Sequence, residues 1–158
     1  MKNYYDDFAD GYLELHREEQ LNKLRIIKNN LKVGKNDLIL DVGCGPGFSA
    51  EFFDCKIIGL DPSFENLKKC SFETVKGFAE KIPFQDDYFD CIISVTAIHN
   101  FKNFRKGLLE MKRVGKKFAF SVLRKVNAFD DIELFIQKHF VVEKIVYEKH
   151  DCLFFCRK

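Results

Sequence analysis

Three alternate glycines directly follow an apolar, strand-like run, and this junction constrains the fold more than any other part of the chain. Residues 38–42 read LILDV and residues 43–47 read GCGPG. Glycines here let the backbone turn sharply after a buried strand and let a ligand lie almost against it, because no side chain obstructs the approach. The junction predicts a ligand crevice at the end of a central strand. A helix beginning near residue 48 would favour an acidic or polar ligand there.

Length and composition favour one soluble domain. A chain of 158 residues, 46% of them hydrophobic, can bury a substantial core but has no room for a second full domain. No run approaches the roughly 20 apolar residues that cross a bilayer, and no apolar signal-peptide stretch follows residues 1–7. We therefore expect a cytoplasmic protein without a membrane segment. The net charge of +2 neither requires nor excludes nucleic acid as a partner.

The six cysteines contain no Cys-x-x-Cys pair and no ligand cluster with histidine. A structural metal normally needs four ligands, so the pattern favours reduced, structural thiols over a metal site.

Strand-like and helix-like segments alternate along the chain, which predicts an α/β fold with a mostly parallel sheet. Nearly continuous apolar runs are typical of central parallel strands that helices cover on both faces. The link between the last two strands is short, so they should form an antiparallel hairpin. The expected strands are residues 37–42, 56–60, 73–77, 90–96, 117–123, 141–147 and 152–156. The expected helices lie near residues 48–53, 63–69, 102–113 and 128–138.

An amphipathic stretch over residues 6–31 predicts one or two leading helices. Its apolar residues Leu21, Leu24, Ile27 and Leu31 recur at helical spacing. No low-complexity or Pro/Gly-rich linker marks a boundary. We therefore expect one domain over residues 1–158, with an N-terminal helical cap at 1–32 and an α/β core at 37–158.

A second carboxylate, Asp61, ends the strand that follows the glycine loop. It lies about 20 residues after Asp41, and both strand ends should face one crevice, where Asp61 could accept hydrogen bonds from ribose hydroxyls. A solvated helix cap before Pro62 is the alternative. The Gly-Lys-Ser/Thr of a phosphate-binding loop is absent. Residues 45–50 formally fit G-x-G-x-x-A, so a dinucleotide site remains open.

Three separated motifs resemble the class I S-adenosyl-L-methionine (SAM)-dependent methyltransferases, particularly those related to quinone-biosynthesis methyltransferases. They are DVGCGPG at residues 41–47, GLDPS at 59–63 and AEKIPFQDDYFD at 79–90. Their order agrees with that family from about residue 37 to the end. The resemblance implies a Rossmann-like methyltransferase fold with a seven-stranded sheet, SAM as cofactor and S-adenosyl-L-homocysteine (SAH) as product.

The resemblance also implies roles for individual residues. The glycines would line the methionine part of the cofactor, with Asp41 behind its ammonium group and Asp61 on the ribose. Many relatives have Asp where this chain has Phe78, so the adenine amino group would be left to Glu80 or to backbone groups. The full set expected around the cofactor is Tyr5, Tyr12, Asp41, Gly43, Cys44, Gly45, Gly47, Asp61, Pro62, Ser63, Ala79, Glu80, Ile82 and Thr96.

The end of the fourth strand would place Thr96, His99 and Asn100 near the transferring methyl group. A sulfonium methyl is already electrophilic, so alignment of the acceptor supplies much of the acceleration and a catalytic residue is optional. His99 is the best candidate base, although a histidine at such a junction often only hydrogen-bonds the loop. Asn100 could equally cap the helix that follows.

The acceptor is the least determined part of the interpretation. Nine basic residues and one acid occur over residues 102–125, and five of the bases are expected at the ligand-binding end: Lys102, Arg105, Lys106, Arg124 and Lys125. This pattern fits RNA contact or a solvated helix face. The absence of long insertions predicts an open site, which suits a tRNA or protein acceptor, an activator subunit or a homo-oligomer partner. A small metabolite remains possible.

Two further functions stay open. One is a non-catalytic module or regulatory subunit that binds SAM or SAH. The other is an NAD-dependent oxidoreductase. Intact motifs favour the methyltransferase over both.

Overall fold

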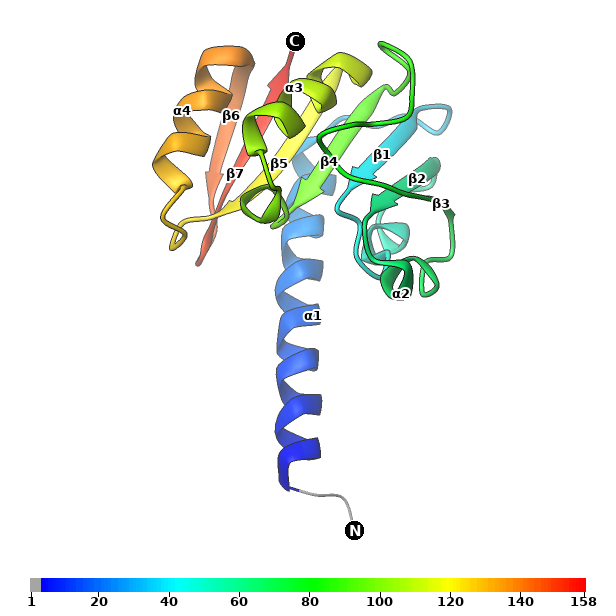
Figure 1. Cartoon of the computed structure of the whole chain (residues 1–158), viewed down its shortest axis with the longest axis vertical. Coiled ribbons are helices and arrows are strands. Elements are labelled where there is room, and N and C mark those ends of the chain that lie inside the picture. The colour runs from blue at the N-terminus through cyan, green and yellow to red at the C-terminus, as the bar shows by residue number, and fades with distance from the viewer. Residues whose placement is uncertain (1–3) are drawn as a thin grey trace.

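Seven strands form one mixed sheet in the order β3-β2-β1-β4-β5-β7-β6 (Figure 1). The computed structural model describes the backbone of residues 4–158 and the side chains of residues 14–158. The strands are β1 (Leu38–Val42), β2 (Lys56–Asp61), β3 (Glu73–Lys76), β4 (Cys91–Val95), β5 (Lys117–Leu123), β6 (Val141–Tyr147) and β7 (Asp151–Arg157). Each strand end lies within one residue of its predicted position. The predicted fold class is therefore confirmed.

Four α-helices and two short 3-10 helices connect these strands. They are α1 (Tyr4–Asn30), η1 (Phe48–Glu51), α2 (Phe64–Leu67), η2 (Ile98–Asn100), α3 (Phe104–Val114) and α4 (Phe129–His139). The leading amphipathic stretch is thus a single helix. Its predicted apolar stripe is confirmed, since Leu21, Leu24, Ile27 and Leu31 are all buried.

The last strand runs antiparallel between two strands that precede it in the chain. β7 pairs antiparallel with β5 on one side and with β6 on the other, so the predicted hairpin is confirmed and β6 becomes the edge strand. Nearly all of β7 is buried, whereas β6 is largely exposed. Because β7 runs backwards, its first residue, Asp151, pairs with Leu123 at the carboxyl end of β5. This position brings Asp151 to the edge of the sheet where ligands are expected.

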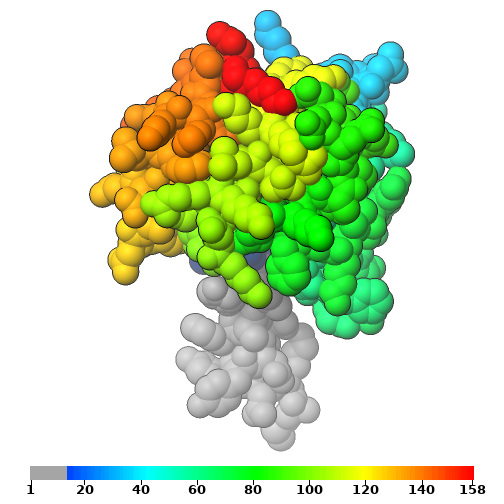
Figure 2. All heavy atoms as spheres, turned by 45° about the horizontal axis from the view of Figure 1, so that its top comes forward, coloured from blue at the N-terminus to red at the C-terminus, as the bar shows by residue number. Residues whose placement is uncertain are grey.

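Alternate residues of the central strands feed two apolar cores. Ile39, Ile57 and Ile93 point to the face that α1 covers. Leu40 and Ile92 point to the opposite face, which α3 and α4 cover. Figure 2 shows this second face, with α4 in orange beside α3 and the green segment that follows β3. Burial on both faces explains why the central strands are almost continuously apolar.

The helix predicted at residues 48–53 is only a 3-10 helix of four residues, η1. Phe53, just beyond it, is buried in the core beneath α1, and the chain must reach β2 at Lys56. These constraints end the helix after about one turn. So short a helix has little dipole, so it gives little support to the expectation that a helix end favours an acidic or polar ligand here.

Among residues 4–158, no helix combines the length and the apolar character needed to cross a membrane. Within the described residues, no group of His, Cys, Asp and Glu side chains is arranged to hold a metal ion. All six cysteines are free thiols.

Burial of α1 against the sheet predicts a large difference between two leucines of that helix. Leu24 is 3% exposed and Leu15 is 60% exposed. Leu24→Ala should lower the free energy of unfolding by about 2–5 kcal/mol, because it leaves a cavity in the core. Leu15→Ala should change it by less than about 0.5 kcal/mol. Urea unfolding of both variants tests this, and equal losses would contradict the docking of α1.

Candidate functional site

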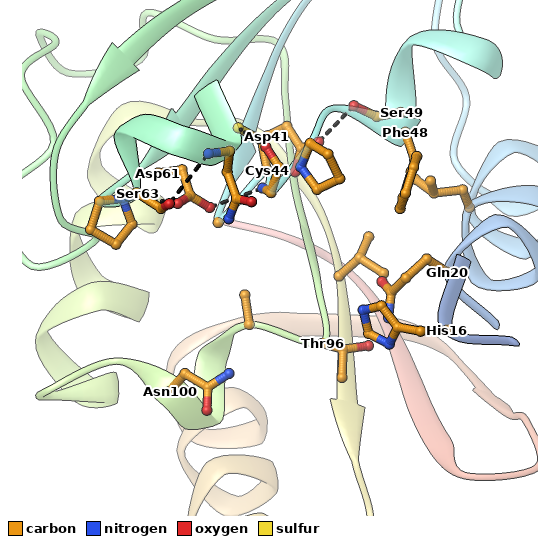
Figure 3. A pocket seen from close by; sticks show the side chains of 18 of the residues that line it. His16, Gln20, Asp41, Cys44, Phe48, Ser49, Asp61, Ser63, Thr96 and Asn100 are labelled. Carbon is orange, nitrogen blue, oxygen red and sulfur yellow. Dashed lines mark hydrogen bonds between the residues drawn. The ribbon is translucent and has the colours of Figure 1, made fainter. Parts of the chain in front are cut away.

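A cavity of about 470 Å³ opens at the carboxyl ends of β1, β2 and β4, beside α1 (Figure 3). Within the sheet, β2 and β3 lie on one side of β1, and the chain then returns to place β4 on the other side of β1. Open α/β sheets bind ligands at such a reversal of strand order. The topology therefore places the cavity where a ligand site is expected.

Nine residues predicted from the sequence line this cavity: Asp41, Gly43, Cys44, Gly45, Asp61, Pro62, Ser63, Thr96 and Asn100. In Figure 3, Asp41, Cys44, Asp61 and Ser63 group on one side, and His16, Gln20 and Thr96 group on another. The glycine loop, the end of β2 and the segment after β4, which are far apart in the sequence, thus meet around one space.

The remaining predicted residues lie elsewhere. Ala79 and Glu80 line a smaller cavity of about 130 Å³, which shares Gly43, Pro62 and Asn100 with the first.

Three others, Gly47, Ile82 and His99, line neither cavity. A Cβ at Gly47 would lie 2.9 Å from the Cys70 Sγ atom, and Ile82 is buried in the core beneath α3 and α4. The side chains of Tyr5 and Tyr12 lie outside the described residues.

The glycine loop is held by backbone contacts and leaves open space at its tip. Gly43 and Gly45 have positive φ angles of 72° and 54°. The Gly43 N–H donates to the Leu60 carbonyl at 2.7 Å, and a Cβ at Gly43 would lie 2.6 Å from the Ala97 Cβ. A Cβ at Gly45 would meet no atom within 4 Å. Gly43 therefore permits close packing of two loops, whereas Gly45 keeps the cavity clear.

Two buried carboxylates define the electrostatics of the cavity. The Ser49 hydroxyl donates to Asp41 Oδ2 at 2.6 Å. Asp61 accepts from the backbone N–H groups of Gly45 at 2.9 Å and of Ser63 at 2.8 Å. Burial raises the pKa of Asp41 to about 7; the Ser49 hydrogen bond opposes this rise and the charge of Asp61 adds to it.

Among the described side chains, no lysine or arginine lines this cavity. Two neighbouring carboxylates without a lysine or arginine partner favour a cationic ligand. A positive charge would reduce the repulsion between them and offset the free-energy cost of burying their charges. The donor and acceptor groups thus fit a ligand that combines positive charge with hydroxyl groups.

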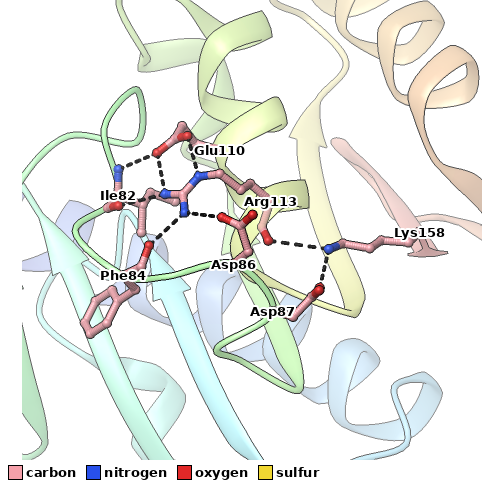
Figure 4. A network of polar contacts seen from close by, with 7 residues as sticks. All are labelled: Ile82, Phe84, Asp86, Asp87, Glu110, Arg113 and Lys158. Atoms are coloured by element: carbon pink, nitrogen blue, oxygen red, sulfur yellow. Dashed lines mark hydrogen bonds and ion pairs between the residues drawn. The ribbon is translucent and has the colours of Figure 1, made fainter.

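The third motif is an irregular segment that α3 holds in place (Figure 4). The Arg113 guanidinium donates to the carbonyl oxygens of Ile82 at 3.0 Å and Phe84 at 2.8 Å, and it pairs with Asp86 and Glu110. Glu110 also accepts from the Ile82 N–H at 2.9 Å. Arg113 therefore gives this segment, which has no strand or helix of its own, a defined path beside the smaller cavity.

Glu80 makes a structural contact in this arrangement. Its carboxylate accepts a hydrogen bond of 2.8 Å from the N–H of Asn103, the residue that caps α3. Phe78 is 52% exposed beside the same small cavity.

His99 does not line the main cavity. Its Nδ1 atom is buried and has no hydrogen-bond partner among the residues with described side chains. Burial lowers its pKa, the charge of Asp151 opposes that change, and the charge of Lys23 adds to it. His99 is therefore held in its neutral form near pH 7.

Thr96 has an unusual backbone conformation at the cavity wall. Its φ angle is 52°, in the left-handed region that β-branched residues avoid. Such a conformation costs on the order of 1–3 kcal/mol and persists only where the surroundings enforce it. The site therefore contains one strained residue.

Tyr5 and Tyr12 of α1 were assigned to the cofactor from the sequence, but three other residues of this helix were missed. His16, Gln20 and Leu24 line the cavity, and their four-residue spacing places them on one side of the helix. That spacing was a signal in the sequence, but it is common in helices. It became specific only once α1 was docked beside the glycine loop.

Comparison with known proteins matches residues 40–122 to the family described as "Methyltransferase domain". The chain belongs to this methyltransferase family. The phthiotriol/phenolphthiotriol dimycocerosates methyltransferase of Mycobacterium tuberculosis is 33% identical over 142 residues, which cover 78% of this chain and 53% of that protein. The chain thus spans about half the length of that relative. The predicted resemblance to class I SAM-dependent methyltransferases is confirmed.

Solved structures share the methyltransferase fold. A SAM-dependent methyltransferase from Aquifex aeolicus has a TM-score of 0.68 at 21% identity, over 89% of this chain and 88% of that one. The methyltransferase-like partner in a complex with the Haloferax volcanii Trm112 methyltransferase activator has a TM-score of 0.77 at 14% identity, over 99% of this chain and 98% of that one. At these identities the likeness concerns the fold alone.

Two glycines of the glycine loop, Gly43 and Gly45, should respond differently to alanine. Gly43→Ala should lower the free energy of unfolding by about 2–5 kcal/mol, since it adds a clash with Ala97 to the strain of positive φ. Gly45→Ala should cost only the strain, about 1 kcal/mol. Chemical denaturation measures both, and equal losses would contradict the close contact at Gly43.

The raised pKa of Asp41 predicts a pH-dependent stability. The ordinary pKa of 3.8 rises to about 7 in the folded protein, so the folded state binds more protons than the unfolded chain between these values. The stability from this group is complete below pH 3.8 and is lost as pH rises through about 7. Asp41→Asn should remove that loss, so its free energy of unfolding relative to wild type should be about 2 kcal/mol higher at pH 8 than at pH 5. The free energy of unfolding in urea is measured against pH for both proteins. Parallel curves for Asp41→Asn and wild type would contradict the raised pKa of Asp41.

Proposed function

We propose that this chain is a SAM-dependent methyltransferase that transfers a methyl group by in-line displacement to a nucleophilic acceptor. The observation that carries the proposal is the pair of buried carboxylates, Asp41 and Asp61, around an open glycine loop with no lining lysine or arginine among the described residues. When bound, SAM supplies an electrophilic methyl group on a positively charged sulfur. Family membership and fold support the same activity.

Asp41 and Asp61 divide the recognition of this cofactor. Asp41 would face the ammonium group, with which a buried carboxylate gains a compensating charge. Asp61 would accept hydrogen bonds from the ribose hydroxyls. Its two oxygens already accept from Gly45 and Ser63, but each has a second lone pair available. Those backbone bonds would aim the carboxylate before the ligand arrives.

The smaller cavity is proposed to hold the adenine. Ala79 and Phe78 offer apolar surface there, and Pro62 connects it to the main cavity. Ile82 would support this wall from the core. The carboxylate of Glu80 already accepts from Asn103, so the adenine amino group would compete for it or would use backbone carbonyls.

The acceptor would approach from the side of Thr96 and Asn100. Asn100 lies on the cavity wall and can orient a polar acceptor (Figure 3). His99 is proposed as the base that takes a proton from the acceptor, since burial keeps its imidazole neutral. A side-chain rotation or the acceptor itself would have to bring the imidazole and the acceptor together.

Lys102 supports a macromolecular acceptor or partner at the ligand-binding end, although Arg105 there is 4.0 Å from Asp131. At the opposite end of the sheet, Arg113, Lys116 and Lys117 are paired with acids. Lys102, in contrast, lies 5.2 Å from the centre of the exposed Phe78 ring at the small cavity. The fold shared with the Haloferax volcanii partner of an activator supports a similar partner for this chain.

Binding measurements separate this proposal from its alternatives. Calorimetry should show binding of SAM and SAH, and not of NAD, to the wild-type protein. Asp61→Asn should weaken SAM binding at least tenfold, because the ribose loses a charged acceptor. Asp54→Asn removes an exposed carboxylate from the loop that leads into the amino end of β2, away from the cavity, and should leave binding unchanged. Binding of NAD alone would overturn the proposal in favour of an oxidoreductase.

Transfer of a labelled methyl group from SAM into fractions of a cell extract would then distinguish an enzyme from a non-catalytic binding module. The labelled fraction would also identify the acceptor class. Labelling that requires co-expression with an activator would establish the partner.

A further inference from the structure

Four polar side chains meet beneath the cavity wall, at the edge of the sheet where β4 and β5 end. They are Lys23 of α1, Thr96 after β4, Ser121 of β5 and Asp151 at the start of β7. We refer to them as the polar junction. Lys23 is 3% exposed, and Ser121 and Asp151 are fully buried. Neither charged residue belongs to a recognised methyltransferase motif of this chain.

The polar junction is closed by short contacts among all four residues. Lys23 Nζ lies 2.9 Å from Asp151 Oδ1 and donates a hydrogen bond of 2.9 Å to the Thr96 hydroxyl. The hydroxyl groups of Thr96 and Ser121 donate to Asp151 Oδ2, at 3.0 and 3.1 Å. The Thr96 N–H donates to the Ser121 hydroxyl at 2.9 Å and to the Ser121 carbonyl at 3.0 Å. Both the side chain and the backbone of Thr96 are thereby tethered.

Thr96 is the one member of the polar junction that lines the main cavity. It is also the residue with the strained φ angle of 52°. A threonine does not adopt this conformation without enforcement. Its contacts with Lys23, Ser121 and Asp151 provide that enforcement from the side away from the ligand.

Stability alone does not account for a buried ion pair at this place. The free-energy cost of removing two charges from water can match or exceed the gain from their attraction. Apolar residues of similar size often stabilise a fold equally well. The junction does give one defined geometry. Lys23 also ties α1 to the strand ends, and Gln20 and His16, about one and two turns earlier on α1, line the cavity.

We propose that Lys23, Ser121 and Asp151 are positioning residues that hold Thr96 in its left-handed conformation and so shape the wall that faces the sulfonium methyl group. The inference rests on the proposed function, because it assigns the methyl end of the ligand to the side of the cavity formed by Thr96. It gives α1 a role in the site that does not depend on direct contact with the reacting atoms.

The decisive variant is Lys23→Met/Asp151→Leu, which removes both charges and leaves the net charge unchanged. The Thr96 and Ser121 hydroxyl groups, 3.1 Å apart, can still bond to each other. We expect a folded protein in which the Cα and Cβ chemical shifts of Thr96 leave the values of a left-handed residue. We also expect SAM affinity, measured by calorimetry, to fall at least fivefold relative to SAH affinity, because the methyl group and the positive charge on the sulfur that carries it are what distinguish the two ligands.

A matched control removes an exposed ion pair from the opposite end of β7. Arg157 and Glu143 are each 58% exposed and 3.1 Å apart. Arg157→Met/Glu143→Leu should leave the Thr96 chemical shifts unchanged and the ratio of SAM to SAH affinity within twofold of wild type. If the junction double variant does not fold, Asp151→Asn, which keeps the shape of the side chain, is measured in its place.

Rescue tests whether the backbone of Thr96 is what matters. Glycine adopts positive φ without a steric penalty, so Thr96→Gly in the double variant should restore most of the wild-type affinity ratio. An unchanged ratio in the double variant, or no rescue by glycine, would overturn the positioning role. Wild-type protein that binds neither SAM nor SAH would instead refute the proposed function, whereas the chemical shifts would still report on the junction.

Discussion

Parallel pairing of β1 with both β2 and β4 is the constraint on which the rest of this structure depends. Backbone hydrogen bonds hold these three strands in register, so their carboxyl ends meet at one edge of the sheet. The strand order reverses at β1, with β2 on one side of it and β4 on the other, and the glycine loop, Asp61 and Thr96 all lie at the strand ends next to this reversal. Each motif would be an ordinary loop if the strands were paired in another order. Strand pairing in the sheet brings these separate segments together around a single cavity.

Within that cavity, the position of Asp61 links structure and recognition. Its carboxylate connects the end of β2 to Gly45 and to Ser63, so the same group that would contact a ligand also orders the loop around it. Asp41 lies close enough for the charge of Asp61 to contribute to its raised pKa. Such a pair is unfavourable without a cation, so the cavity suits a positively charged ligand.

The helix α1 has two functions that its amphipathic pattern does not distinguish. Its apolar residues complete the core on one face of the sheet. Its polar residues reach the strand ends, where Lys23 meets Asp151 and where His16 lines the cavity. A buried charged pair is a poor source of stability but a good source of geometric definition, because few arrangements satisfy all of its hydrogen bonds. Thr96, with its positive φ angle, is the residue whose conformation these hydrogen bonds hold in place.

The sequence by itself determined the strands, the order of the motifs and the family. Period-two and continuous apolar runs report burial directly, and glycine loops report close backbone approach, so β1 to β7 and residues such as Asp41 and Asp61 could be predicted from local patterns. Only the tertiary structure decided that η1 is a single turn, that β7 inserts beside β5, and that Lys23 is a buried partner of Asp151 rather than part of a solvated face. These features depend on contacts between residues far apart in the chain, and no local pattern encodes the free energy of a contact whose partner is not yet placed.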